Sequence, residues 1–270
     1  MQFGIEVVPF GEYANPSKIL ELAIAADQAG WAGLWVWDHV LMPYGAGDPW
    51  VTLAAVAACT HHLKLVPGVA ALPRYHPHLL ARFLTGLDLL SQGRVILGAG
   101  AGAIHEEFTH FGGPGEIQRR AEMLDESLEM IAGLASGEPF EYQGKYYSVD
   151  GVALQPRPFQ QPRIPVWIGG ESRAALRRAA RWDGWMIGTV DENSQVTRTP
   201  EQLFKEVESI RRWRANPGPF DVAIDGISQP GERSLAGEYA DAGATWWFEI
   251  LFGLRGSHAE MLQRIKAGPP

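Results

Sequence analysis

The sequence is poor in cysteine, in basic residues and in long apolar segments. Cys59 is the only cysteine among 270 residues, so the chain can form neither an intramolecular disulfide nor a cysteine-based zinc site. Lysine and arginine number 23 against 31 aspartates and glutamates, and the net charge of −8 argues against broad binding to nucleic acid or anionic membranes. The longest nearly uninterrupted apolar run, residues 51–59, is too short to cross a bilayer.

Composition and the N-terminal segment point to a soluble globular protein. The segment MQFGIEVVPF lacks the basic start of a secretory signal, so we expect a cytoplasmic chain with neither nucleic-acid nor membrane partners. Hydrophobic residues make up 46% and charged residues 20%, which suffices for a sizeable core and excludes a disordered chain. The length also fits one (β/α)8 barrel, which typically has roughly 250 residues.

Short β-branched or aromatic runs alternate with longer segments whose apolar residues recur at helical spacing. This pattern is typical of repeated β-α units around a parallel sheet. The starts of the first four strands are evenly spaced, with no shift in composition that would mark a linker. We therefore predict an α/β fold with a single (β/α)8 TIM barrel over residues 1–270. The predicted strands are Phe3–Val8, Gly33–Trp37, Lys64–Ala71, Arg94–Ala99, Ile164–Gly169, Gly184–Gly188, Phe220–Ile227 and Thr245–Leu251.

The even spacing fails between the fourth helix and the fifth strand. Residues 137–163 form a predicted insertion, in which 141–143 and 145–147 flank Gly144 and indicate a small β-hairpin. It could serve as a lid, a dimer contact or a surface decoration. Elsewhere, Asn15-Pro16 predicts a capped helix start, and residues 199–202 and 257–260 predict capping boxes.

Polar residues follow or interrupt several predicted strands. Since the C-terminal ends of barrel strands meet at one face, Asp38 and His39 are candidate site residues there. The imidazole can transfer a proton near neutral pH, and the carboxylate can orient or charge-stabilise a neighbour. Glu249 shares a strand face with Trp247 and would be a buried acid if that face is the interior. Glu6, on the first strand, would likewise be a buried acid if it faces the interior. For Glu6 and Glu249 alike, the alternative is that the carboxylate forms an internal salt bridge.

Glycine-rich strand ends provide candidate ligand contacts. Proline and glycine within 66–73 indicate a bulge, where the backbone either approaches a ligand closely or packs as a tight corner. Residues 98–103 match a dinucleotide-binding pattern, but three β-α units precede them and no strong helix follows immediately. A better phosphate candidate is 168–172, where two glycines precede Ser172, the predicted cap of a helix over 173–181.

Taken together, five separated segments resemble the bacterial luciferase-like superfamily, and the similarity spans nearly the whole chain. Members of this superfamily are (β/α)8 barrels that bind FMN or the deazaflavin coenzyme F420 at the C-terminal ends of the strands, and they act as monooxygenases, dehydrogenases or reductases. The segments are Ala26–Trp31 with Leu34–His39, Leu72–Pro77, Gly93–Gly100, and Ile164–Gly170 with Ser172.

The resemblance implies a flavin- or F420-dependent oxidoreductase that acts on a small organic substrate by hydride transfer or monooxygenation, with a homodimer as a family expectation. His39 is the expected proton donor or acceptor, and Asp38 would hold its surroundings, with Glu249 as a further catalytic candidate. The implied cofactor contacts are Val69, Ala70 and Ala71 at the bulge, where several members have a non-prolyl cis peptide, Gly100 and Ala101 at the ring, and Gly169, Gly170, Ser172, Ile187 and Gly188 at the phosphate.

Some features depart from the family pattern or allow other functions. Ala103 stands where some sugar-phosphate dehydrogenases carry an acid, which makes such a substrate doubtful, and the short loop after the sixth strand predicts an open or partner-completed site.

A metal-dependent hydrolase and a non-catalytic flavin-binding protein are the alternative functions, although no metal site is predicted. The hydrolase would use Asp38, His39, His76 and His78; the candidate walls of a flat pocket are Trp37, Trp185 and Trp247.

Overall fold

The computed structural model describes residues 1–191, 193–252 and 255–270. Its main sheet has nine strands in the order β3-β2-β1-β11-β10-β9-β8-β5-β4, and every neighbouring pair is parallel. The strands confirm all eight predicted strand segments, with shifts at their ends. They are β1 (Gln2–Val7), β2 (Gly33–Val36), β3 (Lys64–Pro67), β4 (Ala70–Ala71), β5 (Leu97–Gly100), β8 (Val166–Gly169), β9 (Gly184–Ile187), β10 (Asp221–Gly226) and β11 (Trp246–Leu251).

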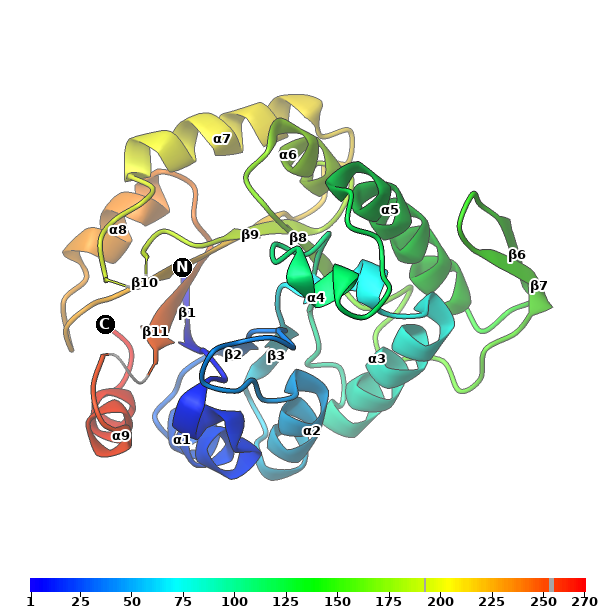
Figure 1. Cartoon of the computed structure of the whole chain (residues 1–270). Coiled ribbons are helices and arrows are strands. Elements are labelled where there is room, and N and C mark those ends of the chain that lie inside the picture. Colours follow the sequence, from blue (N-terminus) through cyan, green and yellow to red (C-terminus); the bar gives the residue numbers. More distant parts are fainter. Residues whose placement is uncertain (192, 253–254) are drawn as a thin grey trace.

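The third barrel strand is split and joins the two ends of the sheet. A cis peptide between Gly68 and Val69 separates β3 from β4. β4 pairs with β5, and β3 also reaches the fourth strand through a parallel bridge between Leu65 and Val95. The two halves therefore act as one strand, and the sheet closes into the predicted TIM barrel (Figure 1).

The helices form a ring around this barrel (Figure 1). None of those in the described ranges is long and apolar enough to cross a membrane. The ring contains α1 (Pro16–Gln28), α2 (Pro49–Cys59), α3 (Pro77–Ser91), α5 (Ile117–Leu134), α6 (Arg173–Ala179), α7 (Pro200–Trp213), α8 (Ser234–Asp241) and α9 (His258–Lys266), and the shorter turns are η1 (Gly11–Ala14), η2 (Leu72–Arg74) and α4 (Glu106–Thr109).

Sequence signals at helix starts act as predicted. The side chain of Asn15 caps α1, which begins at Pro16, and Ser172 caps α6. Both predicted capping boxes form, with Thr199 and Gln202 at α7 and with Ser257 and Glu260 at α9. Each box satisfies backbone N–H groups that a helix start would otherwise leave unpaired.

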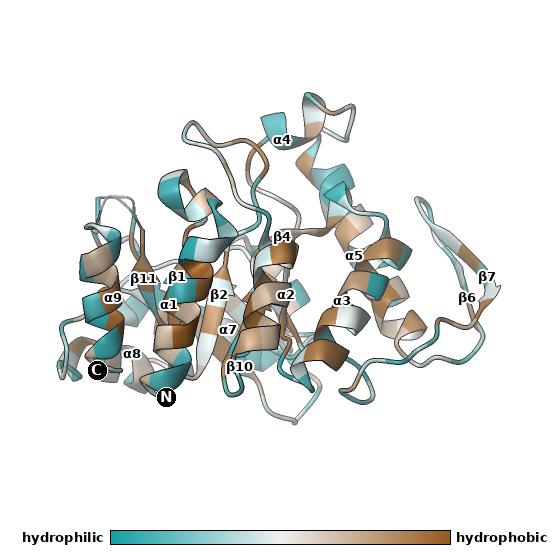
Figure 2. Cartoon of the chain, turned by 90° about the horizontal axis from the view of Figure 1, so that it is seen from below, coloured by the Kyte–Doolittle hydropathy of each residue, from teal (hydrophilic) through white to brown (hydrophobic). Residues whose placement is uncertain are grey.

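The core has two layers that follow from the alternation of side chains along the strands. Ile5, Val7 and other outward-facing residues pack against apolar residues of the helices. The ribbons of these helices carry both hydrophobic and hydrophilic residues (Figure 2). Inward-facing residues fill the barrel itself, where the rings of Trp35 and Phe248 meet edge to face, with centroids 5.5 Å apart. This inner group comprises Trp35, Val66, Ile96, Trp167, Met186, Ala223, Trp246 and Phe248. It closes the barrel interior below the C-terminal ends of the strands.

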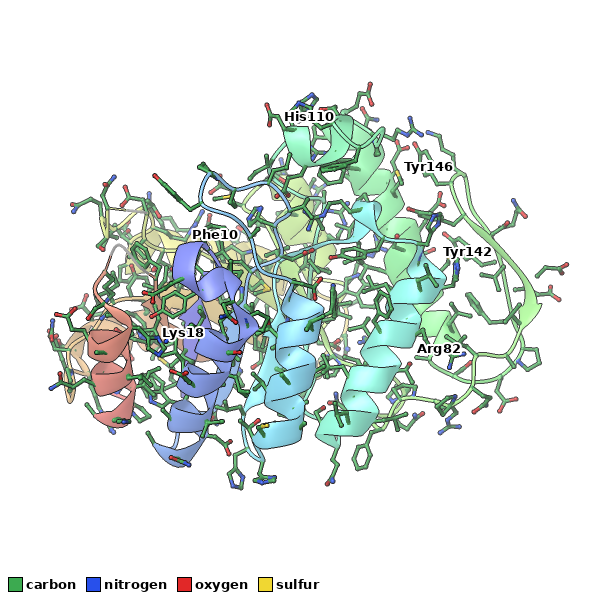
Figure 3. All side chains as sticks on the ribbon, turned by 60° about the horizontal axis from the view of Figure 1, so that its bottom comes forward. Phe10, Lys18, Arg82, His110, Tyr142 and Tyr146 are labelled. Carbon is green, nitrogen blue, oxygen red and sulfur yellow. The ribbon has the colours of Figure 1, made fainter. Side chains whose placement is uncertain are left out.

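The predicted hairpin forms between α5 and β8 and stands beside α5 (Figure 3). Its strands are β6 (Phe140–Gln143) and β7 (Ser148–Val152), so the second strand starts later than predicted. The carboxylate of Glu126 on α5 accepts backbone N–H groups from residues 145–147 at 2.7–3.0 Å, and Glu122 accepts from the Tyr146 hydroxyl at 2.6 Å. Acidic residues of α5 thus hold the turn of the hairpin. The extent of the insertion, 137–163, stays a prediction.

Arg94, which precedes β5, links the end of α2 and the segment after it to the end of α3. The residue is 9% exposed, and its guanidinium donates to the carbonyl oxygens of Ala57, Thr60, Leu63 and Ser91 at 2.8–3.0 Å. These carbonyls lie at and after the end of α2 and at the end of α3. One cation therefore satisfies buried acceptors that would otherwise need water.

We expect Arg94→Met to lower the free energy of unfolding by about 3 kcal/mol, because several buried carbonyl groups lose their donor while the apolar stem is kept. Urea unfolding measures the change. Arg181→Met is the control, since the Arg181 side chain is 55% exposed and its ion pairs with Asp125 and Glu129 are long, at 3.7 Å. Equal stability of the two variants would contradict the role given to Arg94.

Candidate active site

Asp38 lies directly after β2 and is held by β4 and η2. Its Oδ2 accepts from the N–H of Ala71 at 3.1 Å and pairs with the Arg74 guanidinium at 2.6 Å. Its Oδ1 accepts from the Tyr75 hydroxyl at 2.9 Å. Burial and the charge of Asp38 raise the pKa of Tyr75, so the phenol stays a neutral donor. Asp38 is 4% exposed and is thus a buried anchor for the ends of the second and third strands.

His39 is the next residue and is oriented by Glu107 of α4. The His39 Nδ1 lies 3.1 Å from Glu107 Oε1, which also accepts from the N–H groups of Val40 and Leu41. Glu107 Oε2 pairs with Arg74 at 2.6 Å. With a carboxylate at Nδ1, the neutral imidazole carries its proton there, and Nε2 is left as the acceptor. Nε2 makes no hydrogen bond with the residues that the structure describes.

Two aromatic rings, those of Trp37 and Phe10, lie beside the His39 ring. The ring centroids of His39 and Trp37 are 5.8 Å apart, and Phe10 lies 5.9 Å from His39 and 6.0 Å from Trp37. The Trp37 indole N–H donates to Glu6 Oε1 on β1. The His39 side chain is 20% exposed, whereas Glu107 is 1% exposed. The imidazole can therefore meet a ligand while its orienting carboxylate remains buried.

The third-strand bulge brings the predicted ring-contact residues together. A Cβ placed on Gly100 or on Gly169 would lie 2.5 Å from a methyl carbon of Val69, so both positions need glycine to accommodate that side chain. The predicted non-prolyl cis peptide is present at Gly68–Val69, and the Trp35 indole donates to the Gly68 carbonyl at 2.5 Å. Val69 and the two glycines form a floor, whereas Ala70 and Ala101 pack with the outer layer of the core and Ala71 is buried at the end of β4.

The predicted phosphate-contact residues lie on the neighbouring strands β8 and β9. Gly170 is exposed at φ +113°, and its carbonyl accepts from the Trp185 indole at 2.8 Å. The Ser172 hydroxyl caps α6 and accepts from the Ala175 N–H at 3.1 Å. The Gly188 carbonyl, after Ile187, accepts from Arg198 at 3.0 Å, and the same guanidinium pairs with Glu171 at 3.0 Å. A cation thus stands between the two loops.

Glu249 does not belong to this group, which corrects its assignment as a catalytic candidate. Its strand neighbour Trp247 packs in the outer layer of the core, and Glu249 faces the same way. The carboxylate pairs with Arg255 at 2.5 Å and with Arg264 of α9 at 3.5 Å, and it accepts from Ser228. Glu249 therefore holds an internal salt bridge between the barrel and α9, which was the alternative from the sequence.

Two other candidates also face away from the barrel interior. Trp185 and Trp247 pack in the outer layer, so Trp37 is the only one of the three proposed aromatic walls that stands beside the inner core.

His76 and His78 contact each other at the start of α3, with ring centroids 5.8 Å apart. Across residues 1–191, 193–252 and 255–270, no group of three or more metal-binding side chains is arranged around a common point.

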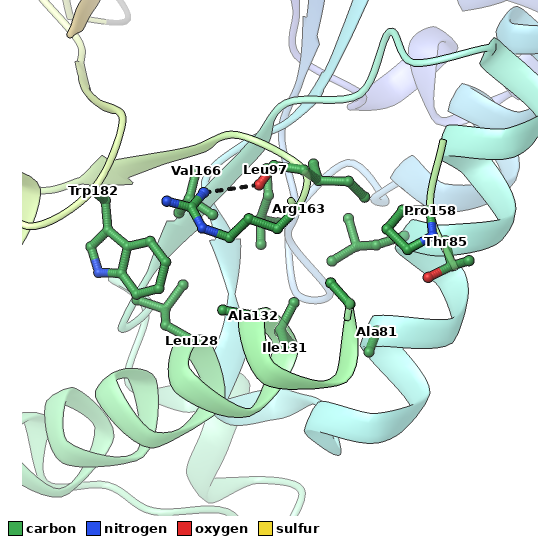
Figure 4. Close-up of a pocket in the computed structure, with 13 residues that line it drawn as sticks. Ala81, Thr85, Leu97, Leu128, Ile131, Ala132, Pro158, Arg163, Val166 and Trp182 are labelled. Carbon is green, nitrogen blue, oxygen red and sulfur yellow. Dashed lines mark hydrogen bonds between the residues drawn. The ribbon is translucent and has the colours of Figure 1, made fainter. Parts of the chain in front are cut away.

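A separate apolar pocket lies outside the barrel, between α3, α5 and the outer side of β5 and β8 (Figure 4). Leu84, Leu128 and Val166 line it, and Pro158 and Arg163 of the segment before β8 cover it. It contains none of the predicted site residues. We assign this pocket to helix packing.

Sequence reasoning missed the charged residues that orient Asp38 and His39. In the sequence, Arg74 and Tyr75 stand out only as part of the family-like segment Leu72–Pro77, and no pattern marks Arg198 or Glu107, which lies on the short helix α4. The one available signal was charge density: HEE at 105–107 puts two acids directly after a glycine-rich strand end.

Comparison with known proteins gives this geometry a family context. A family model described as luciferase-like monooxygenase matches residues 1–247. The chain belongs to the luciferase-like monooxygenase family. This confirms the resemblance seen in the sequence, and it agrees with the barrel and with the position of the bulge.

Relatives of this family member include F420-dependent enzymes. An F420-dependent hydroxymycolic acid dehydrogenase of Mycobacterium tuberculosis is 34% identical over 271 residues, which cover 86% of this chain and 74% of the relative. An F420-dependent glucose-6-phosphate dehydrogenase of Nakamurella multipartita is 33% identical over 200 residues, covering 70% of this chain and 57% of the relative.

Solved structures of the family share the fold. The monooxygenase RslO1 from Streptomyces bottropensis has a TM-score of 0.81 at 21% identity, covering 99% of this chain and 97% of its own. An F420-dependent secondary alcohol dehydrogenase in complex with an F420–acetone adduct has a TM-score of 0.80 at 17% identity, covering 100% and 98%. At these identities the likeness shows the fold alone.

A buried acid of β10 predicts how the stability of this luciferase-like protein depends on pH. Burial raises the pKa of Asp225 from 3.8 to about 6, against hydrogen bonds from Thr189 and Val190 and the charge of Arg198, which lower it. Between these pH values the folded state holds a proton on Asp225 that the unfolded chain has lost. The contribution of Asp225 to the free energy of unfolding therefore falls as the pH rises from about 4 to about 6.

We expect this fall to reach about 3 kcal/mol in the wild type and to be clearly smaller in Asp225→Asn, because the amide does not titrate. Urea unfolding at several pH values between 4 and 7 measures it. The control Asp150→Asn changes an exposed acid of β7 and should leave the wild-type profile unchanged. Identical profiles for Asp225→Asn and the wild type would refute the assignment.

Proposed function

We propose that the protein is an F420-dependent dehydrogenase that interconverts a secondary alcohol and a carbonyl compound. The observation that carries this proposal is His39, whose Nδ1 is held by a buried carboxylate while its other nitrogen lies at the accessible end of the barrel. A proton-transfer residue of this kind suits the removal of a hydroxyl proton. The F420-dependent relatives support the cofactor, and the hydroxymycolic acid dehydrogenase among them supports an alcohol as the substrate class.

The residues at the mouth of the barrel fit a planar cofactor. Gly100 and Gly169 have no side chains and flank Val69, and a methyl group at either position would collide with it. Alanine occupies 70, 71 and 101, so none of these positions places a large side chain on this floor. Backbone N–H groups after β8 could hold an anionic tail without an excess of positive side chains, as a chain with a net charge of −8 requires, because the nearby Arg198 is already paired with Glu171 and Glu206.

In this proposal the residues of the chain bind, orient and transfer a proton. When bound, F420 supplies hydride transfer, and the protein supplies position and electrostatics. His39 Nε2 takes the hydroxyl proton of the alcohol, and Glu107 at Nδ1 stabilises the imidazolium that forms. Asp38 and Arg74 fix the backbone that carries His39. Phe10 and Trp37 limit access of water to the ring.

Ala103 supports a substrate other than a sugar phosphate, because an acid that some sugar-phosphate dehydrogenases carry at this place is missing. The predicted homodimer, the cytoplasmic location and the extent of the single domain over 1–270 stay predictions. So do the roles of the individual cofactor-contact residues.

Titration of the purified protein with F420 and with FMN tests the cofactor. We expect F420 to bind with the lower Kd, and secondary alcohols to bleach the absorbance of bound oxidised F420. Tighter binding of FMN, together with oxygen-dependent product formation in the presence of a flavin reductase, would instead indicate a monooxygenase. Binding of neither cofactor would overturn the proposed function.

We expect His39→Ala to lower kcat by about 10²- to 10⁴-fold while changing the Kd of the cofactor by less than about threefold, since a proton acceptor is lost and the binding surface is kept. Steady-state turnover and cofactor titration give the two values. His78→Ala is the control, because His78 is exposed on α3 and makes no contact with the candidate site. Unchanged turnover in His39→Ala would remove His39 from the mechanism.

A further inference from the structure

Two acids inside the barrel have no part in the proton transfer described above. Glu6 on β1 is 0% exposed and Asp225 on β10 is 2% exposed. β1 and β10 are alternate strands of the barrel, separated by β11, and side chains of one interior layer come from alternate strands. Gly169 of β8, which packs against Val69, belongs to the same set of alternate strands.

The two carboxyl groups have unequal surroundings. Asp225 Oδ1 accepts from the Thr189 N–H at 2.5 Å, and the positive charge of Arg198 stabilises its anionic form. Glu6 accepts one hydrogen bond, from Trp37 to Oε1, and its Oε2 has no partner among the described residues. Burial and the charge of Asp225 raise the pKa of Glu6. Asp225 is therefore the member that carries charge, and Glu6 is the neutral one.

The bond from Trp37 to Glu6 leads to the proposed proton acceptor. Trp37 follows β2, and its ring lies against those of His39 and Phe10. Glu107 fixes the other side of His39 through Nδ1. The imidazole is thus held between a carboxylate and an indole, and the indole itself is held by Glu6. An unanchored Trp37 could rotate, and the ring of His39 would then be held only by Glu107 and Phe10 among the groups described.

We propose that Glu6 is a positioning residue whose carboxyl group anchors the indole of Trp37 through a hydrogen bond and thereby sets the orientation of the His39 ring. This inference rests on the proposed role of His39. A neutral carboxyl accepts the indole N–H through its carbonyl oxygen without adding a second negative charge beside Asp225. An apolar residue could fill the same space but could not accept the bond.

Three variants separate these properties of Glu6. Glu6→Gln keeps an acceptor oxygen and is always neutral, Glu6→Leu keeps the volume but removes the acceptor, and Trp37→Phe removes the donor from the other end of the bond. Glu12→Leu, at an exposed acid of η1, is the matched control for the loss of a carboxylate. The readouts are kcat, cofactor Kd, and the nitrogen-15 NMR signals of the Trp37 indole and the His39 ring in the cofactor-free protein.

We expect Glu6→Gln to keep the His39 signals and to retain kcat within about twofold, because it reproduces the neutral acceptor. Glu6→Leu and Trp37→Phe should each shift the His39 signals and lower kcat about tenfold, with little change in cofactor Kd, because the proton acceptor is misplaced rather than lost. The double variant should be no worse than either single one, since both break the same link.

Unchanged His39 signals and kcat in Glu6→Leu would overturn the proposal. So would a loss in Glu6→Gln equal to that in Glu6→Leu, because the charge of Glu6 would then be what matters. If Glu6→Leu does not fold, Trp37→Phe tests the same link, and wild-type behaviour of that variant is equally decisive. The NMR signals need no cofactor, so failure to bind F420 would refute the proposed function while the proposal for Glu6 is still tested.

Discussion

The candidate site depends on the ion pairs of Arg74 with Asp38 and Glu107. Arg74 belongs to the third strand and its short helical turn, Asp38 to the end of the second strand, and Glu107 to the helix after the fourth. One cation therefore fixes three strand ends relative to one another. Its partners are almost fully buried, so loss of the guanidinium would leave two carboxylates in a medium that stabilises them poorly. The position of His39 follows from this arrangement, because its orienting carboxylate is one of the two.

The alternation of side chains between the two faces of a strand decides which acids point into the barrel and can act at the site. Glu6 and Glu249 are both fully buried glutamates on neighbouring strands. Glu6 points inward and accepts one hydrogen bond from Trp37, whereas Glu249 points outward and is neutralised by two arginines. Alternation in the sequence shows that Trp247 and Glu249 share a face, but it does not show which face is inside. That choice depends on the closure of the barrel, which is a property of the whole sheet.

Local patterns predicted most of the fold and part of the site. The strands, the caps at Asn15 and Ser172, and the bulge before Val69 each depend on a few neighbouring residues, so the sequence was sufficient for them. Asp38 and His39 could be found because they directly follow a strand. Arg74 and Glu107 could not be found in this way, because their roles depend on contacts with residues more than thirty positions away in the sequence. No spacing rule links an arginine in one loop with a glutamate in another.

The distribution of charge explains how an acidic protein can present a site for an anion. Asp38 and Glu107, near the mouth of the barrel, both pair with Arg74. Burial raises the pKa of Glu6, which favours its uncharged form. The surface of the floor consists of glycine and valine, which add no charge at all. Arg198 lies between the loops after β8 and β9, but its charge is balanced by ion pairs with Glu171 and Glu206. An anion at these loops would therefore depend on backbone N–H groups rather than on an excess of positive side chains.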